Sequence, residues 1–300
     1  MPAFAALTLA AALQVAGVQG TQFDTTFAAV RGDRLEAHVF SGSLTVKSWN
    51  RDQIRIQAAG LEDARERPGR ARVRAGGLDV SRSGGTIRVQ LHPGRSGDGE
   101  GDVTIWVPAA TPVELQGNQT SMTVEGIQAS VRATTIEGEV TVTGGSDFVE
   151  LSSVDGGITV NGVRGRLQAN SVDGAIVVHD VRGSVSVNAV DGAIELIDVD
   201  GPNVQANTVD GDIAFRGPVR SGGTYRLVSH DGDVSATFAG TPDAEVSVST
   251  FSGEFETDMP VTISGTAKAG RQFSFTLGKG GAQVFLETFD GTIRLGRTTR

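Results

Sequence analysis

The chain has 300 residues, 38% hydrophobic and only 5% aromatic, with a formal net charge of −9 at pH 7. This charge argues against a nucleic-acid partner, because phosphate binding requires a concentrated basic surface. The sequence contains no cysteine, which excludes disulfides, thiolate chemistry and an acylated lipoprotein cysteine and is neutral about the compartment.

The first twenty residues form an apolar stretch that ends in small residues before polar Thr21 and Gln22. This pattern predicts a secretory signal peptide over residues 1–20, and therefore a periplasmic or cell-surface protein, although no positive charge lies near Met1. The alternative is a buried or membrane-resting N-terminal helix. No later segment approaches the apolar length of a membrane-spanning helix, so we do not expect an integral membrane protein.

Residues 21–112 are expected to form irregular strands interrupted by two polar loops. The loop at 60–77 mixes both charges around a Pro-Gly and is expected to be a solvated surface; the alternative is an arginine-rich contact for an acidic glycan or lipid headgroup. The loop at 92–102 alternates acids with glycines but lacks the spacing of an EF-hand. It is therefore interpreted as a flexible turn.

Residues 149–216 repeat one phrase four times, in copies of 18 or 19 residues that each carry Asp-Gly between two short apolar segments. The copies read VELSSVDGGITVNGVRGR, LQANSVDGAIVVHDVRGS, VSVNAVDGAIELIDVDGPN and VQANTVDGDIAFRGP. Self-similarity at a fixed period is typical of a solenoid, in which successive turns of chain stack on one another.

Within each copy, apolar residues recur six, four and one positions before the Asp and three and five positions after it. Around Asp173 these residues are Leu167, Ala169, Val172, Ile176 and Val178. Alternation with period two predicts strands whose apolar side chains face inward, with the polar residues between them in solvent. We therefore expect Val172 and its equivalents to line the core.

Asp-Gly is expected to form a tight corner, since Gly accepts positive φ and Asp bonds to its own backbone. A second corner follows at residues 163–165, 181–183 and 199–201. Each turn of the coil should thus hold two strands and two corners, with each strand pairing to its equivalent one turn away. Degenerate copies of the Asp position, which indicate one continuous repeat domain, fall at Ser41, Gly84, Gln119, Glu137, Asp231, Ser252 and Asp290.

The predicted fold is an all-β, single-domain β-solenoid (parallel β-helix) of roughly 18-residue turns, over residues 21–300. Its regular turns are expected at 113–240 and a wider section rich in phenylalanine at 241–300. An insertion at 258–283 is interpreted as a hairpin that caps the end, because the last turn of a solenoid otherwise exposes an unpaired strand edge.

The sequence resembles the bacterial β-strand-repeat proteins of the putative-adhesin family, a domain family of unknown function. The resemblance depends on the repeated S-V-D-G-x-I-x-V, on the WVP, VEL, VEGI and IEGEV motifs within residues 103–143, and on the ending GKGGAQVFLETFDGTIRL at 278–295. It covers nearly the whole chain after residue 20. It implies a β-solenoid at or outside the bacterial membrane, and it implies no catalytic residues.

The most conspicuous candidate site is a ladder of Asp-Gly corners, interpreted as a structural turn ladder. Its members are Asp155, Gly156, Asp173, Gly174, Asp191, Gly192, Asp210, Gly211, Asp231, Gly232, Asp290 and Gly291. Stacked carboxylates would lie about 4.8 Å apart and repel by roughly 1 kcal/mol in a water-like dielectric. They are therefore expected either to face solvent and bond to their own turns or, as the alternative, to share a bridging cation.

Other polar residues recur in register as well. Asn170, Asn188 and Asn207 are expected to form an amide ladder, and Arg164 and Arg182 to stack in solvent at the opposite corner. His230 occupies a position otherwise held by valine and is expected to be partly buried. The sequence shows no nucleophile motif, phosphate-binding loop or zinc motif, so no catalytic, cofactor-binding or metal-binding residues are assigned.

These observations favour a non-catalytic, monomeric cell-envelope or secreted module that binds an unknown surface component or acts as a scaffold. One alternative is a polysaccharide-active β-helix enzyme, although the short regular turns leave little chain to build a cleft. A second is a calcium-stabilised structural repeat protein. A third is an element that self-assembles end to end, against which the expected cap argues.

Overall fold

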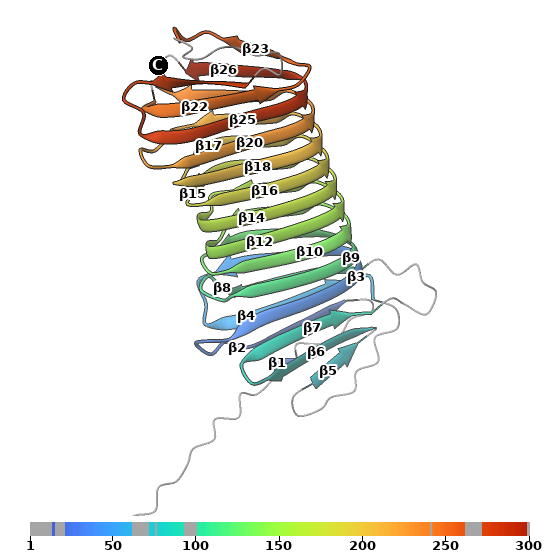
Figure 1. The fold of residues 1–300 in the computed structure, drawn as a ribbon. Coiled ribbons are helices and arrows are strands. Elements are labelled where there is room, and N and C mark those ends of the chain that lie inside the picture. The colour runs from blue at the N-terminus through green and yellow to red at the C-terminus, as the bar shows by residue number, and fades with distance from the viewer. Residues whose placement is uncertain are drawn as a thin grey trace, which may run out of the picture.

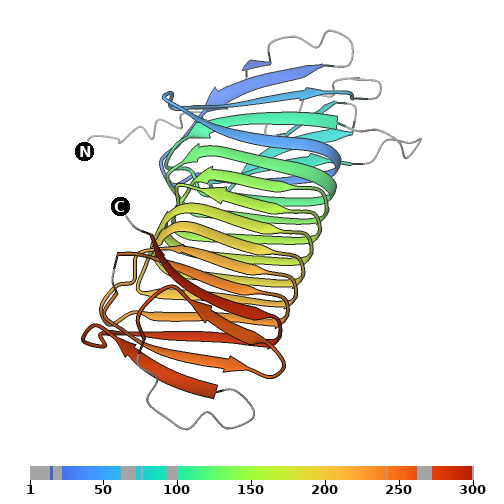
Figure 2. The same cartoon turned by 90° about the horizontal axis from the view of Figure 1, so that it is seen from above.

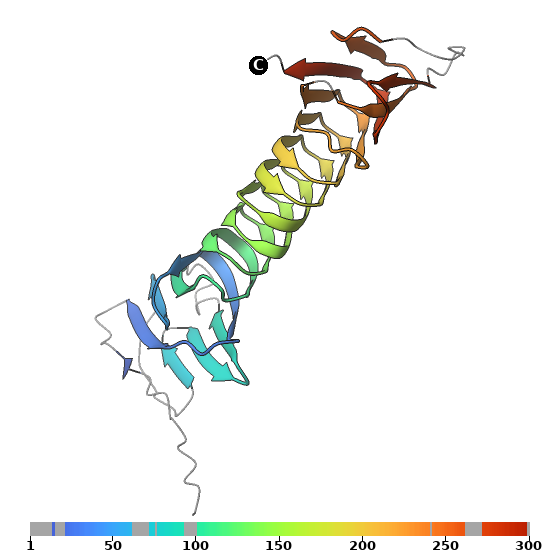
Figure 3. The same ribbon diagram turned by 90° about the vertical axis from the view of Figure 1, so that its left-hand side faces the viewer.

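The computed structural model describes residues 14–15, 22–61, 72–75, 77–92, 101–240, 242–261 and 272–298. These residues form an all-β, β-solenoid-like repeat fold, drawn out into a rod of narrow cross-section (Figures 1 and 3). Among them, no helix is long or apolar enough to span a membrane.

The regular part of the rod consists of two parallel rows of strands. One row runs β9 (Val113–Ile127), β10 (Val131–Glu137), β12 (Ser146–Asp155), β14 (Arg164–Asp173), β16 (Val185–Asp191), β18 (Asn203–Asp210) and β20 (Thr224–Asp231). The other runs from β9 through β11 (Val140–Gly144), β13 (Ile158–Asn161), β15 (Ile176–Arg182), β17 (Ile194–Asp200) and β19 (Ile213–Gly217) to β21 (Val234–Ala239). Figure 1 shows the first row as a ladder.

Equivalent residues of successive copies pair directly. Leu151 is opposite Ala169, and Ala169 is opposite Val187, so each strand pairs in parallel with the strand one repeat later. The stacking of like residues that the repeat predicts is confirmed. Figure 2 shows the same succession of levels from above, and we call each level a rung.

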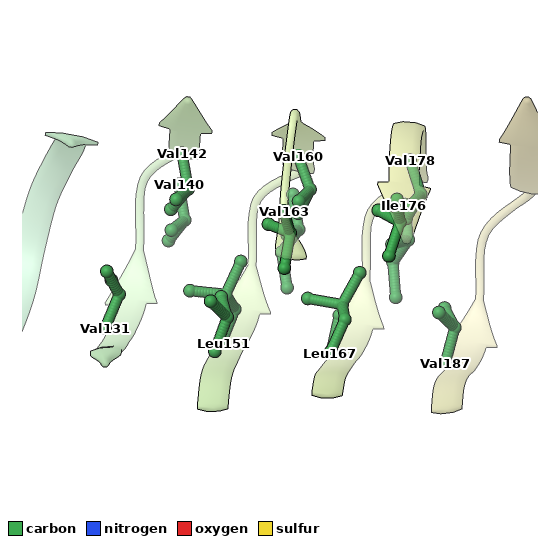
Figure 4. Close-up of a cluster of buried hydrophobic side chains, with 14 of the residues drawn as sticks. Val131, Val140, Val142, Leu151, Val160, Val163, Leu167, Ile176, Val178 and Val187 are labelled. Carbon is green, nitrogen blue, oxygen red and sulfur yellow. The ribbon is translucent and has the colours of Figure 1, made fainter. Parts of the chain in front are cut away.

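The core is a thin layer of Val, Leu, Ile and Ala side chains between the two rows. Leu151, Leu167 and Val187 come from one row, and Val142, Val160 and Val178 come from the facing row (Figure 4). All of these side chains are buried. Burying a side chain of this kind contributes about 1.5–3 kcal/mol, and the repeat supplies such residues at every rung.

At the first corner the side chains point differently from our expectation. Val172 is exposed, whereas the neighbouring Ser171 is buried. The alternation that buries Leu167 and Ala169 continues without a change of phase to Ser171, and the chain then turns and leaves Val172 outside. The prediction that the valine before each Asp lines the core is therefore wrong.

The N-terminal end departs from chain order. The long strand β3 (Arg34–Trp49) pairs with β9 on one side and, on the other, with β7 (Thr86–Leu91) along its first part and β8 (Gly101–Pro108) along its second. Antiparallel strands then extend the end of the rod: β4 (Gln53–Ala59), β2 (Phe23–Ala28) and β1 (Gln14–Val15) beyond β8, and β6 (Leu78–Ser83) and β5 (Arg72–Ala75) beyond β7.

This arrangement corrects one predicted corner. Ser41 pairs directly with Gln119, so no rung intervenes between them. Gly84 instead lies with Gly85 in the turn between β6 and β7, which pair as an antiparallel hairpin. Both glycines have positive φ, +57° and +79°, as a two-residue hairpin turn requires.

The C-terminal end also departs from chain order. β25 (Ala282–Asp290) stacks directly on β20, and β22 (Ala244–Thr250) lies beyond β25, with β24 (Gln272–Leu277) antiparallel to it at the end of the row. In the other row, β26 (Thr292–Thr298) stacks on β21 and β23 (Glu254–Thr257) stacks on β26. The rung that contains Ser252 is therefore outside the rung that contains Asp290, the reverse of the order expected from the sequence.

Several sequence predictions fall partly outside the described residues. Of the expected signal segment, only residues 14 and 15 are described, and they pair with β2. Most of the loops at 60–77 and 92–102 lies outside. Of the expected hairpin at 258–283, residues 262–271 lie outside, and the part described includes β24.

Candidate binding surface

The first corner of each rung in the Asp-Gly ladder is built around a glycine with positive φ. In the predicted ladder these glycines, from Gly156 to Gly291, have φ between +142° and +156°. A Cβ placed on Gly174 would lie 2.6 Å from the carbonyl carbon and oxygen of Gly156 on the adjacent rung. The sequence therefore needs glycine here for two reasons, backbone conformation and the close stacking of corners.

Buried hydroxyl groups fix the inner side of this corner. The Oγ of Ser229 donates to the carbonyl oxygen of Gly211 at 2.9 Å, and the Oγ1 of Thr288 donates to that of Gly232 at 2.9 Å. The hydroxyl column consists of Thr120, Thr135, Ser153, Ser171, Thr208, Ser229, Thr288 and Thr250, all buried. The Oγ1 of Thr250 accepts from the N–H of Gly253 at 2.9 Å, and the other hydroxyls donate to backbone carbonyl oxygens. Because each hydroxyl has a backbone partner, a polar residue is tolerated in the core at this position.

The carboxylates of the ladder stand in register on the outer side. The pairs Asp155–Asp173, Asp173–Asp191 and Asp191–Asp210 occupy equivalent positions on neighbouring strands, and Asp231 is opposite both Asp210 and Asp290. All six side chains are exposed. We call Asp155, Asp173, Asp191, Asp210, Asp231 and Asp290 the acidic column.

The expectation that these carboxylates bond to their own turns is not met. Among the residues that the structure describes, no hydrogen bond or ion pair involves a side chain of the acidic column. The reason is that the backbone N–H groups of the corner are already used: the N–H of Gly174 donates to the carbonyl oxygen of Asp191 at 3.0 Å, and that of Gly156 to Asp173 at 2.9 Å. Backbone hydrogen bonds between rungs thus replace the expected hydrogen bond from the corner N–H to the Asp carboxylate.

Immediately beside the acidic column runs a column of exposed apolar side chains. In spatial order it consists of Ile136, Val154, Val172, Val190, Val209, Phe289 and Phe251, with His230 between Val209 and Phe289. The apolar members are 45–67% exposed. Isolated exposed valines are normal. Here seven apolar residues, with His230 on one intervening rung, form a stripe along the rod, and such stripes mark interaction sites.

The stripe ends in three stacked rings. His230 and Phe289 have ring centroids 4.9 Å apart and planes 8° apart, and Phe289 and Phe251 have centroids 4.6 Å apart and planes 6° apart. His230 is exposed, which corrects the expectation that it is partly buried. It lies outside for the same reason as Val172: the corner turns this position away from the core.

The other flank of the apolar column carries no charge over its central part. The Nδ2 of Asn188 donates to the Oδ1 of Asn170 at 3.0 Å, and the Nδ2 of Asn207 donates to the Oδ1 of Asn188 at 2.9 Å. The predicted amide ladder is confirmed. The apolar column is therefore bordered by carboxylates on one side and by self-paired amides on the other.

Elsewhere on the rod, opposite charges on adjacent rungs neutralise one another. Arg132 pairs with Glu150 at 2.6 Å and Lys47 with Glu125 at 3.2 Å, as do Arg88–Glu36, Arg226–Glu287 and Arg294–Glu256. At the second corner Arg164 is opposite Arg182, as predicted, and both are exposed. The six carboxylates of the acidic column depart from this pattern of compensated charge.

The perturbed carboxyl groups lie away from the acidic column. A hydrogen bond from Arg55 holds the pKa of Asp24 below its ordinary value, and one from Arg220 does the same for Asp200. The pKa of Asp233 is lowered first by the backbone N–H of Thr292 and then by Arg294. These ion pairs and hydrogen bonds connect neighbouring segments of the chain and have the geometry of structural contacts.

Two pockets lie near the N-terminal end of the rod. The first, of about 300 Å³, is lined by His38, Phe40, Gln90, His92, Gln116 and Asn118. The second, of about 350 Å³, lies between Arg34, Glu114, Arg132 and Phe148. Within the described ranges, no three His, Cys, Asp or Glu side chains gather in a way that could hold a metal ion.

The acidic column was predicted from the sequence, whereas the apolar column beside it was not. The alternation along the strand contained the information needed. Leu167, Ala169 and Ser171 are two residues apart and therefore lie on the same side of the strand, whereas Val172 lies on the opposite side. Apolar character alone placed Val172 inside. The unbroken alternation, together with a Ser or Thr at the third inward position of most copies, would have placed Val172 outside.

One protein family and several solved structures are similar to this chain. The family described as Toastrack DUF4097 matches residues 76–213 and 184–296. None of the curated proteins matches the chain. A solved "putative adhesin" from Bacteroides fragilis is similar over 93% of this chain and 100% of its own, with 11% identity and a TM-score of 0.47.

Two further solved structures are similar over most of their length. A "putative lipid binding protein" from Parabacteroides distasonis covers 93% of this chain and 98% of its own, with 10% identity and a TM-score of 0.42. A "putative cell adhesion protein" from Clostridium sporogenes covers 92% and 100%, with 9% identity and a TM-score of 0.25.

Proposed function

Because the chain belongs to the Toastrack family, a bacterial adhesin-like domain of unknown function, we propose that it is a non-catalytic binding module of the cell envelope. In this proposal the protein is exported by the apolar segment at residues 1–20 and is monomeric. It is a single parallel β-solenoid, and the antiparallel strands at its ends act as caps. The Asp-Gly corners serve as a structural ladder that holds the binding surface straight.

The observation that carries the proposal is the apolar column. A repeat protein can place any polar residue at an exposed corner, yet this chain places Ile, Val or Phe at seven rungs of one corner. Exposed apolar side chains gain free energy only when a partner covers them, at about 25 cal/mol per Å² of area removed from water. Extended faces of stacked repeats are suited to such contacts.

The test compares binding to envelope fractions of the producing organism with and without the apolar column. The variant Val172→Ser/Val190→Ser/Val209→Ser removes three adjacent methyl-bearing side chains from exposed positions, so we expect it to fold. A control, Val177→Ser/Ile197→Ser, changes two half-buried outward positions of β15 and β17 on a different side of the rod.

We expect the natural protein and the control to co-sediment with the envelope fraction and the triple variant to remain in the supernatant. Thermal melting followed by circular dichroism verifies that all three proteins are folded. Equal co-sedimentation of the natural protein and the folded triple variant, or co-sedimentation of neither, would count against the proposal.

A further inference from the structure

The chemistry on the two flanks of the apolar column is unequal, and this inequality specifies a partner. On one flank the six carboxylates of the acidic column are exposed and in register. On the other flank Asn170, Asn188 and Asn207 satisfy one another. A matching surface therefore needs an apolar stripe with positive charge along one side of it.

The carboxylates of the acidic column repel one another, and a cationic partner would relieve this repulsion. Neighbouring carboxylates about 4.8 Å apart repel by roughly 1 kcal/mol per pair in a water-like dielectric. Adjacent rungs elsewhere place Arg132 against Glu150 and Lys47 against Glu125, so the fold readily accommodates paired charges. None of the six carboxylates has such a partner within the part of the chain that the structure describes.

The spacing of the column restricts the shape of the partner. Apolar side chains recur along the rod about every 4.8 Å, and a helix lying parallel to the rod presents a row of side chains about every 5.4 Å. From Ile136 to Phe289 the column makes six steps, about 29 Å, which equals the length of a helix of roughly 20 residues. Over this span the two periods differ by less than one rung.

We infer that this corner takes a basic amphipathic helix of a protein partner, laid along the rod with its apolar stripe on the valines and its Lys or Arg residues on the acidic column. This inference rests on the proposed function and names the chemical class of the partner. An anionic bilayer is disfavoured because the acidic column would be repelled by it. A second copy of this chain would bring a further acidic column to the same corner.

The direct probe is a synthetic peptide of about 20 residues with a leucine stripe, lysines on one side of the stripe and glutamine elsewhere. Its binding to the full chain is measured by fluorescence anisotropy at low and high salt. A second peptide with glutamate in place of lysine controls for nonspecific hydrophobic binding. The variants are Val172→Ser/Val190→Ser and Asp173→Asn/Asp191→Asn, with Val177→Ser/Ile197→Ser as the control.

We expect the lysine peptide to bind the natural protein and the control equally, and each column variant at least about tenfold more weakly. The Asp173→Asn/Asp191→Asn variant should also show a smaller loss of affinity on raising the salt concentration, because it removes charges that salt screens. The glutamate peptide should not bind.

The inference is overturned if the lysine peptide fails to bind, or binds both column variants as tightly as the natural protein. It is also overturned if vesicles of phosphatidylglycerol bind in its place through the valines, or if the protein dimerises through them. Loss of envelope co-sedimentation tests the proposed function separately. If binding to the envelope depends on the apolar column but the lysine peptide does not bind, the helical partner is ruled out and the proposed binding module is retained.

Discussion

Phe289 lies flat against His230, with ring centroids 4.9 Å apart, although the strands β21 to β24 separate them in the chain. The contact is possible because β25 stacks directly on β20 and displaces β22 to the outside. The rod is therefore ordered by the fit of its corners as well as by chain order, and its exposed column continues without a break into the C-terminal section.

Stacking of the corners predicts a large effect of a single methyl group. Gly174→Ala should lower the free energy of unfolding by at least about 2 kcal/mol, because the added Cβ would lie 2.6 Å from the carbonyl of Gly156 and φ is +142°. Gly84→Ala is the control: φ is +57° there, but nothing lies within 4 Å. It should cost only about 1 kcal/mol. Urea unfolding measures both, and equal effects would contradict close stacking at the corner.

The amide ladder predicts a graded loss of stability. Asn188 both donates to Asn170 and accepts from Asn207, so Asn188→Ala removes two hydrogen bonds, whereas Asn207→Ala removes one. We expect losses of about 2 and 1 kcal/mol, respectively. Chemical unfolding of the two variants checks this ratio. A loss for Asn188→Ala no larger than that for Asn207→Ala would show that the amides are not coupled.

The acidic column predicts that removing charge does not destabilise the fold. Asp173→Asn/Asp191→Asn should leave the melting temperature unchanged or raise it at low salt, and the difference should vanish at high salt, because repulsion between exposed carboxylates is screened. Addition of millimolar calcium should shift neither protein. A calcium-dependent rise in the natural protein that is absent from the variant would instead indicate a bridging cation.

Asp233 predicts an acid-sensitive attachment of the rung that contains β26. Its Oδ1 accepts from the N–H of Thr292 at 2.7 Å, and its other oxygen pairs with Arg294; together these contacts lower its pKa. A carboxyl group with a folded pKa below its unfolded value stabilises the fold above the unfolded pKa, about 4, and this contribution disappears as pH falls through the folded pKa.

The corresponding test is Asp233→Asn compared with the natural protein at two pH values. At pH 6 we expect the variant to be less stable by about 1 kcal/mol at most, since the carboxylate is 36% exposed and water screens the ion pair. At pH 2.5 the difference should be smaller. A difference that does not change with pH would assign the effect to packing and not to the charge of Asp233.

Most of the repeat architecture could be predicted from the sequence because the information is local and repeated. The 18-residue period sets the pairing of Leu151 with Ala169, and the Asp-Gly pairs mark the corners. The order of the strands at the two ends of the rod could not be predicted in the same way. Gly84 fits the corner pattern by composition, and only pairing between distant strands determines that it closes a hairpin and that Asp290 precedes Ser252 in space.

Of the candidate surface, the acidic column could be predicted from the sequence and the apolar column could not. Asp173 is expected outside because its charged carboxylate is hydrated. The position of Val172 depends on where the strand bends. The inward alternation continues as far as the buried Ser171, whose Oγ donates to the carbonyl oxygen of Gly156 at 3.3 Å, and the chain turns immediately after it. Hydrophobicity alone assigns Val172 and Ser171 to the wrong sides.

The most direct test of the continuous exposed column is a set of distances between paired spin labels. The sequence has no cysteine, so labels attach only at introduced sites: one at Ile136→Cys and a second at His230→Cys, Phe289→Cys or Phe251→Cys. With one rung every 4.8 Å, we expect separations of about 24, 29 and 34 Å in that order. A separation from position 136 that is shorter for 251 than for 289, or distances that do not increase by one rung per step, would contradict the account.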